Sequence, residues 1–106
     1  MPWGVTQTYA VSWDDYQRVV EVVGEDPPDG LYFYAAGPEA QGTRIMSVWD
    51  SAESYETFRV RHLRPAAAQV LGADMPDGPT SHLPLDVQHF LMAHAITPVS
   101  HRIAFY

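Results

Sequence analysis

Residues 31–51, LYFYAAGPEAQGTRIMSVWDS, decide the fold. Every position of residues 31–36 is apolar or aromatic, which indicates a strand covered on both faces and therefore a central strand of a sheet. The polar stretch 37–42 predicts a hairpin loop, and residues 43–49 predict a returning strand that again has apolar side chains on both faces. We expect these two strands to pair antiparallel.

The stretch before this hairpin predicts a strand followed by a helix. Alternation over residues 5–11 is typical of a strand, and residues 13–23 place apolar side chains at helical spacing. Ser12 is expected to cap this helix, and two aspartates fall in its first turn, where the helix dipole favours negative charge. The helix must end before Pro27 and Pro28, because proline lacks the amide hydrogen that a helix needs.

A second helix is expected to begin at Asp50 or Ser51, immediately after the returning strand. Its inward stripe would be Tyr55, Phe58, His62, Leu63 and Ala66. Pro65 lies within this pattern and predicts a kink, or a break before a short segment over residues 66–71.

The rest of the chain gives weaker signals. We interpret residues 72–86 as a loop, residues 87–95 as the last strand and residues 96–106 as a C-terminal arm or edge strand.

The resulting order, strand, helix, strand, strand, helix, strand, predicts one α+β domain over residues 1–106. It is the ferredoxin-like arrangement of an antiparallel sheet with both helices on one face. The other face would then be uncovered, although the strands carry large apolar side chains on both parities. Two such sheets stacked about a two-fold axis would bury both uncovered faces, so we expect a homodimer.

Two segments resemble a known family. Residues 30–38, GLYFYAAGP, and residues 48–58, VWDSAESYETF, are similar to the dimeric α+β barrel proteins, which include antibiotic-biosynthesis monooxygenases, small polyketide cyclases and many uncharacterised bacterial members. The second segment resembles the strand-to-helix junction of that family, and the likeness spans roughly residues 5 to 71. The resemblance implies paired sheets in a dimeric barrel. It implies no single reaction, because this fold hosts many activities.

The candidate catalytic residue is His62. Residues 55, 58 and 62 share one side of a helix at spacings of i, i+3 and i+7, so Tyr55, Phe58 and His62 should face a cavity between helices and sheet. An imidazole among aromatic side chains could move a proton to or from a phenol or enol. The alternative is a core or edge histidine that is hydrogen-bonded to the backbone.

The candidate substrate-binding residues are aromatic: Trp49, Tyr34, Tyr55 and Phe58. The family resemblance suggests that Trp49 lines the cavity and holds a flat substrate, whereas its other interpretation is a structural role at the junction. Tyr32 and Tyr34 share one parity of their strand and could both present hydroxyls to a ligand or to a dimer partner. Tyr34, nearer the strand end, is the preferred donor, with simple packing as its alternative.

Several classes of chemistry lack the residues they need. The chain has no cysteine, so thiolate metal sites and cysteine nucleophiles are excluded. The best candidate cluster for a metal is His82, His89 and His94, but His89 and His94 would point to opposite faces of a strand and could not share one ion without a bulge, so we expect no metal and no cofactor. We do not expect haem degradation, another activity of this fold, because Phe58 and approximately Ala68 occupy the positions where it requires tryptophan and histidine.

Charge and hydropathy restrict the partners. The net charge of −7 opposes binding to a phosphate backbone, and Arg59, Arg61 and Arg64 are spread around a helix rather than along one stripe. We therefore expect no nucleic-acid partner. No stretch is apolar for long enough to span a membrane, and the start of the chain lacks the pattern of a signal peptide, so we expect a cytoplasmic protein.

Two functional hypotheses remain. The first is a cofactor-independent enzyme, a monooxygenase, cyclase or isomerase that acts on an aromatic or polyketide-like molecule. The second is a non-catalytic protein of the same fold that binds a small hydrophobic ligand or only dimerises.

Overall fold

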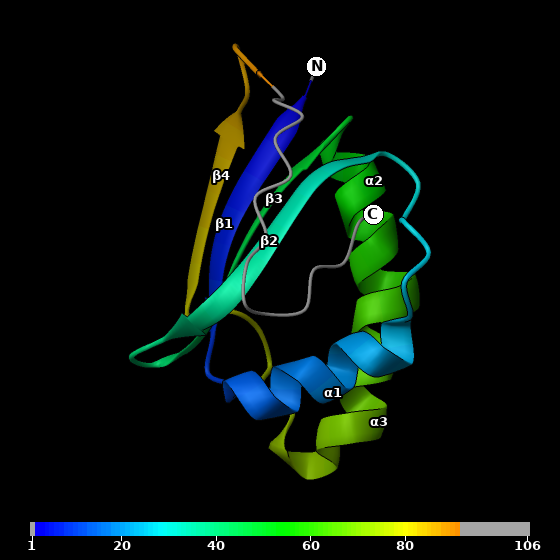
Figure 1. Ribbon diagram of the computed structural model, residues 1–106, viewed down its shortest axis with the longest axis vertical. Coiled ribbons are helices and arrows are strands. Elements are labelled where there is room, and N and C mark those ends of the chain that lie inside the picture. Colours follow the sequence, from blue (N-terminus) through cyan, green and yellow to red (C-terminus); the bar gives the residue numbers. More distant parts are fainter. Residues whose placement is uncertain (1, 92–106) are drawn as a thin grey trace, which may run out of the picture.

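Among the residues that the structure describes, the sheet has four antiparallel strands in the order β2-β3-β1-β4, and the helices lie on one side of it (Figure 1). The computed structural model describes residues 2–91. Its strands are β1 (Trp3–Tyr9), β2 (Leu31–Glu39), β3 (Gly42–Trp49) and β4 (Ser81–Asp86). The helices are α1 (Trp13–Val23), α2 (Ala52–Phe58) and α3 (Arg64–Leu71), with a π-helical turn (Arg59–Leu63) between α2 and α3 and a 3-10 turn (Gly72–Asp74) after α3. This topology confirms the ferredoxin-like α+β fold.

Side-chain caps fix the beginnings of the helices where the sequence places them. The Ser12 hydroxyl accepts a hydrogen bond from the backbone N–H of Asp15 at 3.1 Å, and α1 has the predicted bounds. The Ser51 hydroxyl accepts from the backbone N–H of Ser54 at 3.2 Å and so caps α2. The expected break near Pro65 is not found, because helical backbone continues from α2 through the π-helical turn into α3, and Pro65 stands in the first turn of α3.

The expectation that residues 31–36 form a central strand is wrong for the sheet of residues 2–91, in which β2 lies at the edge and pairs with β3 alone. The error has a physical cause: apolar side chains on both parities indicate two apolar faces, whether or not another layer covers them. Tyr32 and Phe33 are in fact 44% and 45% exposed. The β-bulge between Leu31 and Phe33 also displaces Tyr32 from regular alternation.

The expected loop over residues 72–86 is wrong at its end, where β4 pairs antiparallel with β1. Pro84 concealed this strand, since proline argues against a strand in the interior of a sheet. It is tolerated here because β4 lies at the sheet edge. Residues 87–91 form no strand, and the remainder of the strand expected over residues 87–95 lies outside the described residues, as does the C-terminal arm at 96–106.

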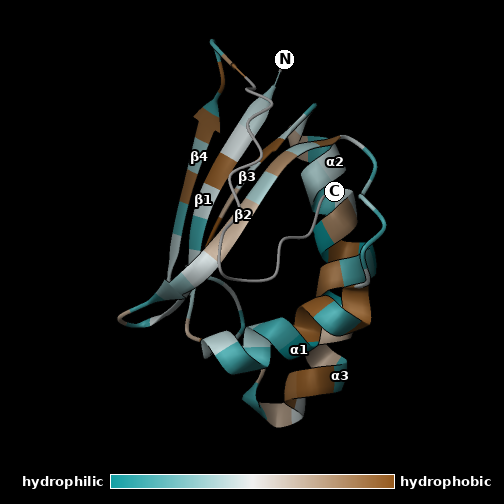
Figure 2. Ribbon diagram, in the orientation of Figure 1, coloured by the Kyte–Doolittle hydropathy of each residue, from teal (hydrophilic) through white to brown (hydrophobic). Residues whose placement is uncertain are grey.

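Register assigns each strand residue to one face of the sheet, because directly paired antiparallel residues share a face. One row across the outer face contains Ala35, Met46, Thr6 and Leu83, and a second contains Phe33, Val48, Gly4 and Leu85. The opposite, helix-covered face contains the row Ala36, Ile45, Gln7 and His82. Hydrophobic positions accordingly occur both on the strands and on the helices in Figure 2.

The core lies at one end of the helix-covered face and is largely aromatic. Trp49 is fully buried, and its ring lies 5.4 Å from that of Phe58 and 5.8 Å from that of Tyr55. Trp3, the cross-strand neighbour of Trp49, also packs against Tyr55, with ring centroids 5.2 Å apart. The Trp49 indole N–H donates to the Ser47 hydroxyl at 2.9 Å, so this buried polar atom is satisfied.

Gly30 occupies a position that no other residue type fits. Its φ is +82°, and a Cβ there would lie 2.5 Å from Oδ1 of Asp50 and 2.6 Å from the hydroxyl of Ser54. We expect Gly30→Ala to lower the free energy of unfolding by about 2 kcal/mol, from backbone strain and the steric clash together. The matched change Gly37→Ala, where a Cβ meets no atom within 4 Å, should have little effect. Urea denaturation measures both, and equal midpoints would contradict the assignment.

Candidate functional site

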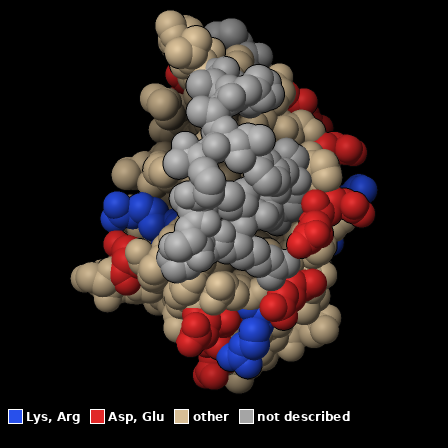
Figure 3. All heavy atoms as spheres, in the orientation of Figure 1, with Lys and Arg blue, Asp and Glu red and all other residues tan. Residues whose placement is uncertain are grey.

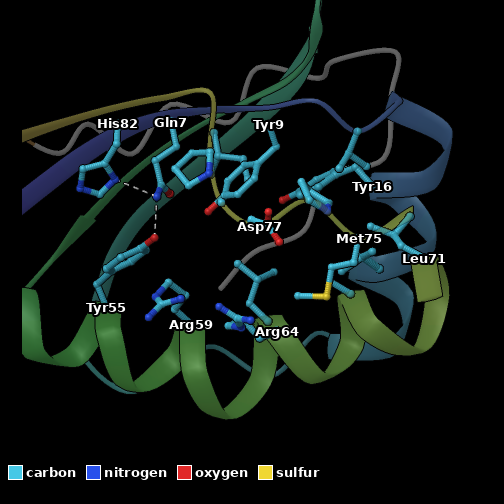
Figure 4. A pocket seen from close by; sticks show the side chains of 18 of the residues that line it. Gln7, Tyr9, Tyr16, Tyr55, Arg59, Arg64, Leu71, Met75, Asp77 and His82 are labelled. Carbon is cyan, nitrogen blue, oxygen red and sulfur yellow. Dashed lines mark hydrogen bonds between the residues drawn. The ribbon is translucent and has the colours of Figure 1, made fainter. Parts of the chain in front are cut away.

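A cavity of about 390 Å³ lies between the helices and the sheet, next to the aromatic core (Figure 4). Gln7, Tyr9 and His82 enter it from the strands, whereas Tyr55, Arg59 and Arg64 extend from the helical side. Its apolar wall includes Val11, Val19, Ile45, Leu63, Ala67, Leu71 and Met75. A volume of this size, mostly apolar and with a few convergent polar groups, is typical of a small-molecule site.

The polar end of the cavity is a hydrogen-bonded group. The Gln7 amide nitrogen, Nε2, donates to the Tyr55 hydroxyl at 2.7 Å and lies 3.1 Å from Nδ1 of His82. Gln7 is only 3% exposed, so its amide is held away from solvent. The hydroxyl of Tyr9 also hydrogen-bonds with that of Tyr55. Four side chains from β1, β4 and α2 therefore meet at one point.

Burial keeps the two phenols of this group neutral. It raises the pKa of Tyr9 well above its usual range, and the neighbouring Tyr55 raises it further. Burial also raises the pKa of Tyr55, although the hydrogen bonds from Gln7 and Tyr9 and the positive charge of Arg59 act in the opposite direction. Both hydroxyls thus remain proton-bearing hydrogen-bonding groups at neutral pH.

Two arginines add positive charge to the cavity. Hydrogen bonds from Arg59 to Glu56 hold the pKa of that carboxyl below its usual range and raise the pKa of Arg59. Arg64 also lines the cavity and forms no ion pair with any residue from 2 to 91. Figure 3 shows acidic side chains interspersed with a few arginines around the face it displays, and Arg18 and Arg44 pair with Asp15 and Glu39.

The expected position of His62 in the cavity is wrong. His62 is exposed, does not line the cavity, and stacks on Phe58 with ring centroids 6.0 Å apart. The cause is the π-helical turn Arg59–Leu63: its wider i→i+5 hydrogen bonding adds a residue to the turn and shifts the following side chains from α-helical spacing. Arg59, Leu63 and Arg64 consequently line the cavity.

Of the four expected substrate-binding residues, the structure places Tyr55 alone in the cavity. Trp49 and Phe58 belong to the buried core, which agrees with the structural alternative for Trp49. Tyr34 contacts the hydroxyl of Tyr16 and, with Phe58, lines a crevice of about 10 Å³ that is too small for a ligand. Tyr32 stacks on Phe90 and lies at the β-bulge between Leu31 and Phe33, which removes it from the regular alternation that it was expected to share with Tyr34.

The cavity also contains residues that the sequence did not predict there: Gln7, Tyr9, Arg59, Asp77 and His82. A signal for Gln7 did exist, since it is the polar member of an otherwise apolar strand parity with Val5, Tyr9 and Val11. No such signal existed for Asp77 or His82, whose positions depend on the unrecognised β4.

The part of the chain that the structure describes contains neither a candidate metal site nor a candidate membrane-spanning helix. Residues 2–91 contain no group of three or more His, Asp or Glu side chains arranged to hold a metal ion. In the same residues, no helix has both the length and the apolar character needed to cross a membrane.

Comparison with solved structures confirms the fold of the family that the sequence resembles. A protein from Chloroflexus aurantiacus, described as an antibiotic biosynthesis monooxygenase, is 16% identical with a TM-score of 0.60, covering 92% of this chain and 100% of that one. Rv0793 from Mycobacterium tuberculosis is 16% identical with a TM-score of 0.61, covering 87% and 100%. A variant of SnoaB, a cofactor-independent oxygenase from Streptomyces nogalater, is 11% identical with a TM-score of 0.50, covering 85% and 94%.

These identities establish a shared fold and nothing finer. No family model matches the sequence, and no curated protein matches it significantly.

The raised phenol pKa values predict a late tyrosine titration. We expect absorbance titration to show phenols that ionise well above about pH 10, the ordinary value, and Tyr9→Phe and Tyr55→Phe should each remove part of this late component. Because the unfolded state would ionise first, folding stability should fall as the pH rises above about 10. If Tyr9→Phe left the late component unchanged, Tyr9 would not be shielded as described.

Proposed function

We propose that the protein binds an aromatic or polyketide-like small molecule in this cavity and converts it without a cofactor. The observation that carries the proposal is the combination of a largely apolar cavity of about 390 Å³ with one polar end formed by neutral phenols. A flat, apolar molecule with an oxygen at one edge matches that distribution. The fold shared with SnoaB, a cofactor-independent oxygenase, supports the same class of reaction.

The groups that line the cavity suggest how the reaction would proceed. Tyr55 would hydrogen-bond an oxygen of the ligand, and the positive charge of Arg59, which acts on both phenols, would stabilise negative charge that develops there. Asp77 also lines the cavity and points into it in Figure 4, whereas Glu56 is bonded to Arg59. Asp77 would therefore accept the proton of a bound phenol or enol. Oxygenation would use dioxygen as the co-substrate, whereas cyclisation or isomerisation would need none.

The acid–base role expected of His62 thus passes, in this proposal, to residues that line the cavity. We expect Asp77→Asn to lower turnover about 100-fold while it leaves binding intact, because it removes only the proton acceptor. Tyr55→Phe should weaken both binding and turnover, and His62→Ala should change neither binding nor turnover. The test uses a panel of phenols and anthrones with up to three fused rings. Mass spectrometry of the products measures turnover, and ligand titration measures binding.

Two results would redirect the proposal. If His62→Ala lost turnover while Asp77→Asn remained active, the acid–base role would return to His62. Binding of the panel without turnover of any member would favour the non-catalytic ligand-binding alternative.

We also propose that the outer face of the sheet forms a homodimer interface. Phe33, Met46, Leu83 and Leu85 lie in its two neighbouring rows and are 45%, 46%, 63% and 64% exposed. Large apolar side chains that gather on one exposed face are characteristic of an interface. Pairing of two copies through this face leaves the cavity on the opposite face of each sheet free for a ligand.

Light scattering at micromolar concentration tests the interface. We expect a mass of about twice 11.9 kDa for the unaltered protein and a monomer for Leu83→Glu, since a charge would be buried between the sheets. The control is Val60→Glu, an equally simple change at a residue that is 51% exposed on the helical side, and it should remain dimeric. A monomeric unaltered protein would remove this face from consideration.

A further inference from the structure

Gln7 connects two groups that have different access to solvent. Its side chain is 3% exposed and lies between Tyr55, which lines the cavity, and His82, which is exposed on β4. One amide nitrogen serves both, at 2.7 Å from the Tyr55 hydroxyl and 3.1 Å from Nδ1 of His82. A primary amide nitrogen carries two hydrogens, so it can donate to both partners at once.

These donations fix the direction of the Tyr55 hydroxyl. Its oxygen accepts the hydrogen bond from Gln7 and also shares a hydrogen bond with Tyr9; when Tyr9 donates that bond, the Tyr55 hydrogen is the hydrogen-bonding capacity that remains. In that arrangement the Tyr55 hydrogen is directed to the cavity that its side chain lines. The Tyr55 O–H is therefore available to donate to a ligand.

The same arrangement depends on the protonation of His82. Nδ1 can accept from Gln7 only while it carries no hydrogen, which defines a neutral imidazole protonated at Nε2. When His82 gains its second ring proton, on Nδ1, the N–H group of His82 faces the N–H group of Gln7. Rotation of the amide by half a turn relieves that conflict, because the Gln7 oxygen then accepts from His82 and from Tyr55. In this second state the Tyr55 hydrogen points to Gln7 and no longer to the ligand.

We propose that the Tyr55 hydroxyl makes the cavity selective for ligands that present a carbonyl or other acceptor oxygen to it, and that Gln7 couples this hydroxyl to His82, so that protonation of His82 cancels the selectivity. The inference rests on the proposed function, because it assigns the ligand of the same cavity. The charged or titratable groups around the network are Glu56 and Arg59 on the helical side, Tyr9 on β1 and Asp77 in the loop before β4.

A pair of probes separates selectivity from simple apolar binding. 1,4-Naphthoquinone and naphthalene have similar size and shape, but only the quinone carries acceptor oxygens. The chain contains neither cysteine nor lysine, so side-chain addition to the quinone is avoided. Ligand-observed NMR gives both dissociation constants, and we expect the quinone to bind about ten-fold more tightly at about pH 8, the effect of one well-placed hydrogen bond.

Two substitutions at residue 7 examine the direction of the bond. In Gln7→Glu the carboxylate can only accept, so it should hold the Tyr55 hydrogen. The quinone and naphthalene should then bind about equally tightly. Gln17→Glu adds the same charge on the exposed surface of α1 and should keep the preference. Gln7→Met has neither donor nor acceptor, so Tyr55 should keep its hydrogen for the ligand and the preference should persist at every pH. This variant also serves if the buried glutamate prevents folding.

Lowering the pH from about 8 to about 5, the range in which histidines gain charge, examines the role of His82. The quinone preference of the unaltered protein should fall as the pH falls, and His82→Leu should abolish that dependence. An equal preference in the unaltered protein and in Gln7→Glu, or the same pH dependence in His82→Leu, overturns the inference. Failure of both probes to bind the unaltered protein counts instead against the proposed function.

Discussion

Packing of the Trp49 indole against Tyr55 and Phe58 is the contact on which the rest of the structure depends. It joins the end of β3 to the beginning of α2, with an indole N–H that is satisfied by Ser47. Because this contact closes one end of the space between helices and sheet, the remaining space beside it is the cavity. Tyr55 belongs to both: its ring packs in the core and its hydroxyl meets the polar end of the cavity.

The π-helical turn then determines which side chains reach the cavity. An uninterrupted α-helix would have placed residue 62 on the same side as residues 55 and 58. The turn over Arg59–Leu63 instead leaves His62 exposed, while Arg59 and Arg64 line the cavity. Pro65 follows this turn and stands within the first turn of α3. Turns of this type are frequent at functional sites, which agrees with the cavity beside it.

Much of the fold could be predicted from local chemistry, but the site could not. The Ser12 cap and the apolar spacing after it gave α1, and the polar loop between two apolar runs gave the β2–β3 hairpin. Strand β4 was hidden by Pro84, which is acceptable only at a sheet edge, and edge position is a property of the whole topology. His62 was misplaced because constant helical spacing was assumed across a turn whose hydrogen bonding no local pattern revealed. Gln7 and His82 become a pair only through the register of β1 with β4.

In the proposed arrangement the two faces of one sheet have different tasks: the helix-covered face binds a ligand, and the outer face binds a second copy of the chain. Two methionines report on these faces separately, since Met75 lines the cavity and Met46 lies 46% exposed on the outer face. The most direct measurement is therefore methyl NMR of the methionine-labelled protein during titration with 1,4-naphthoquinone. We expect intermolecular contacts and shift changes at the Met75 methyl and none at that of Met46. Contacts at Met46 with an unchanged Met75 would contradict the central claim that the cavity is the ligand site.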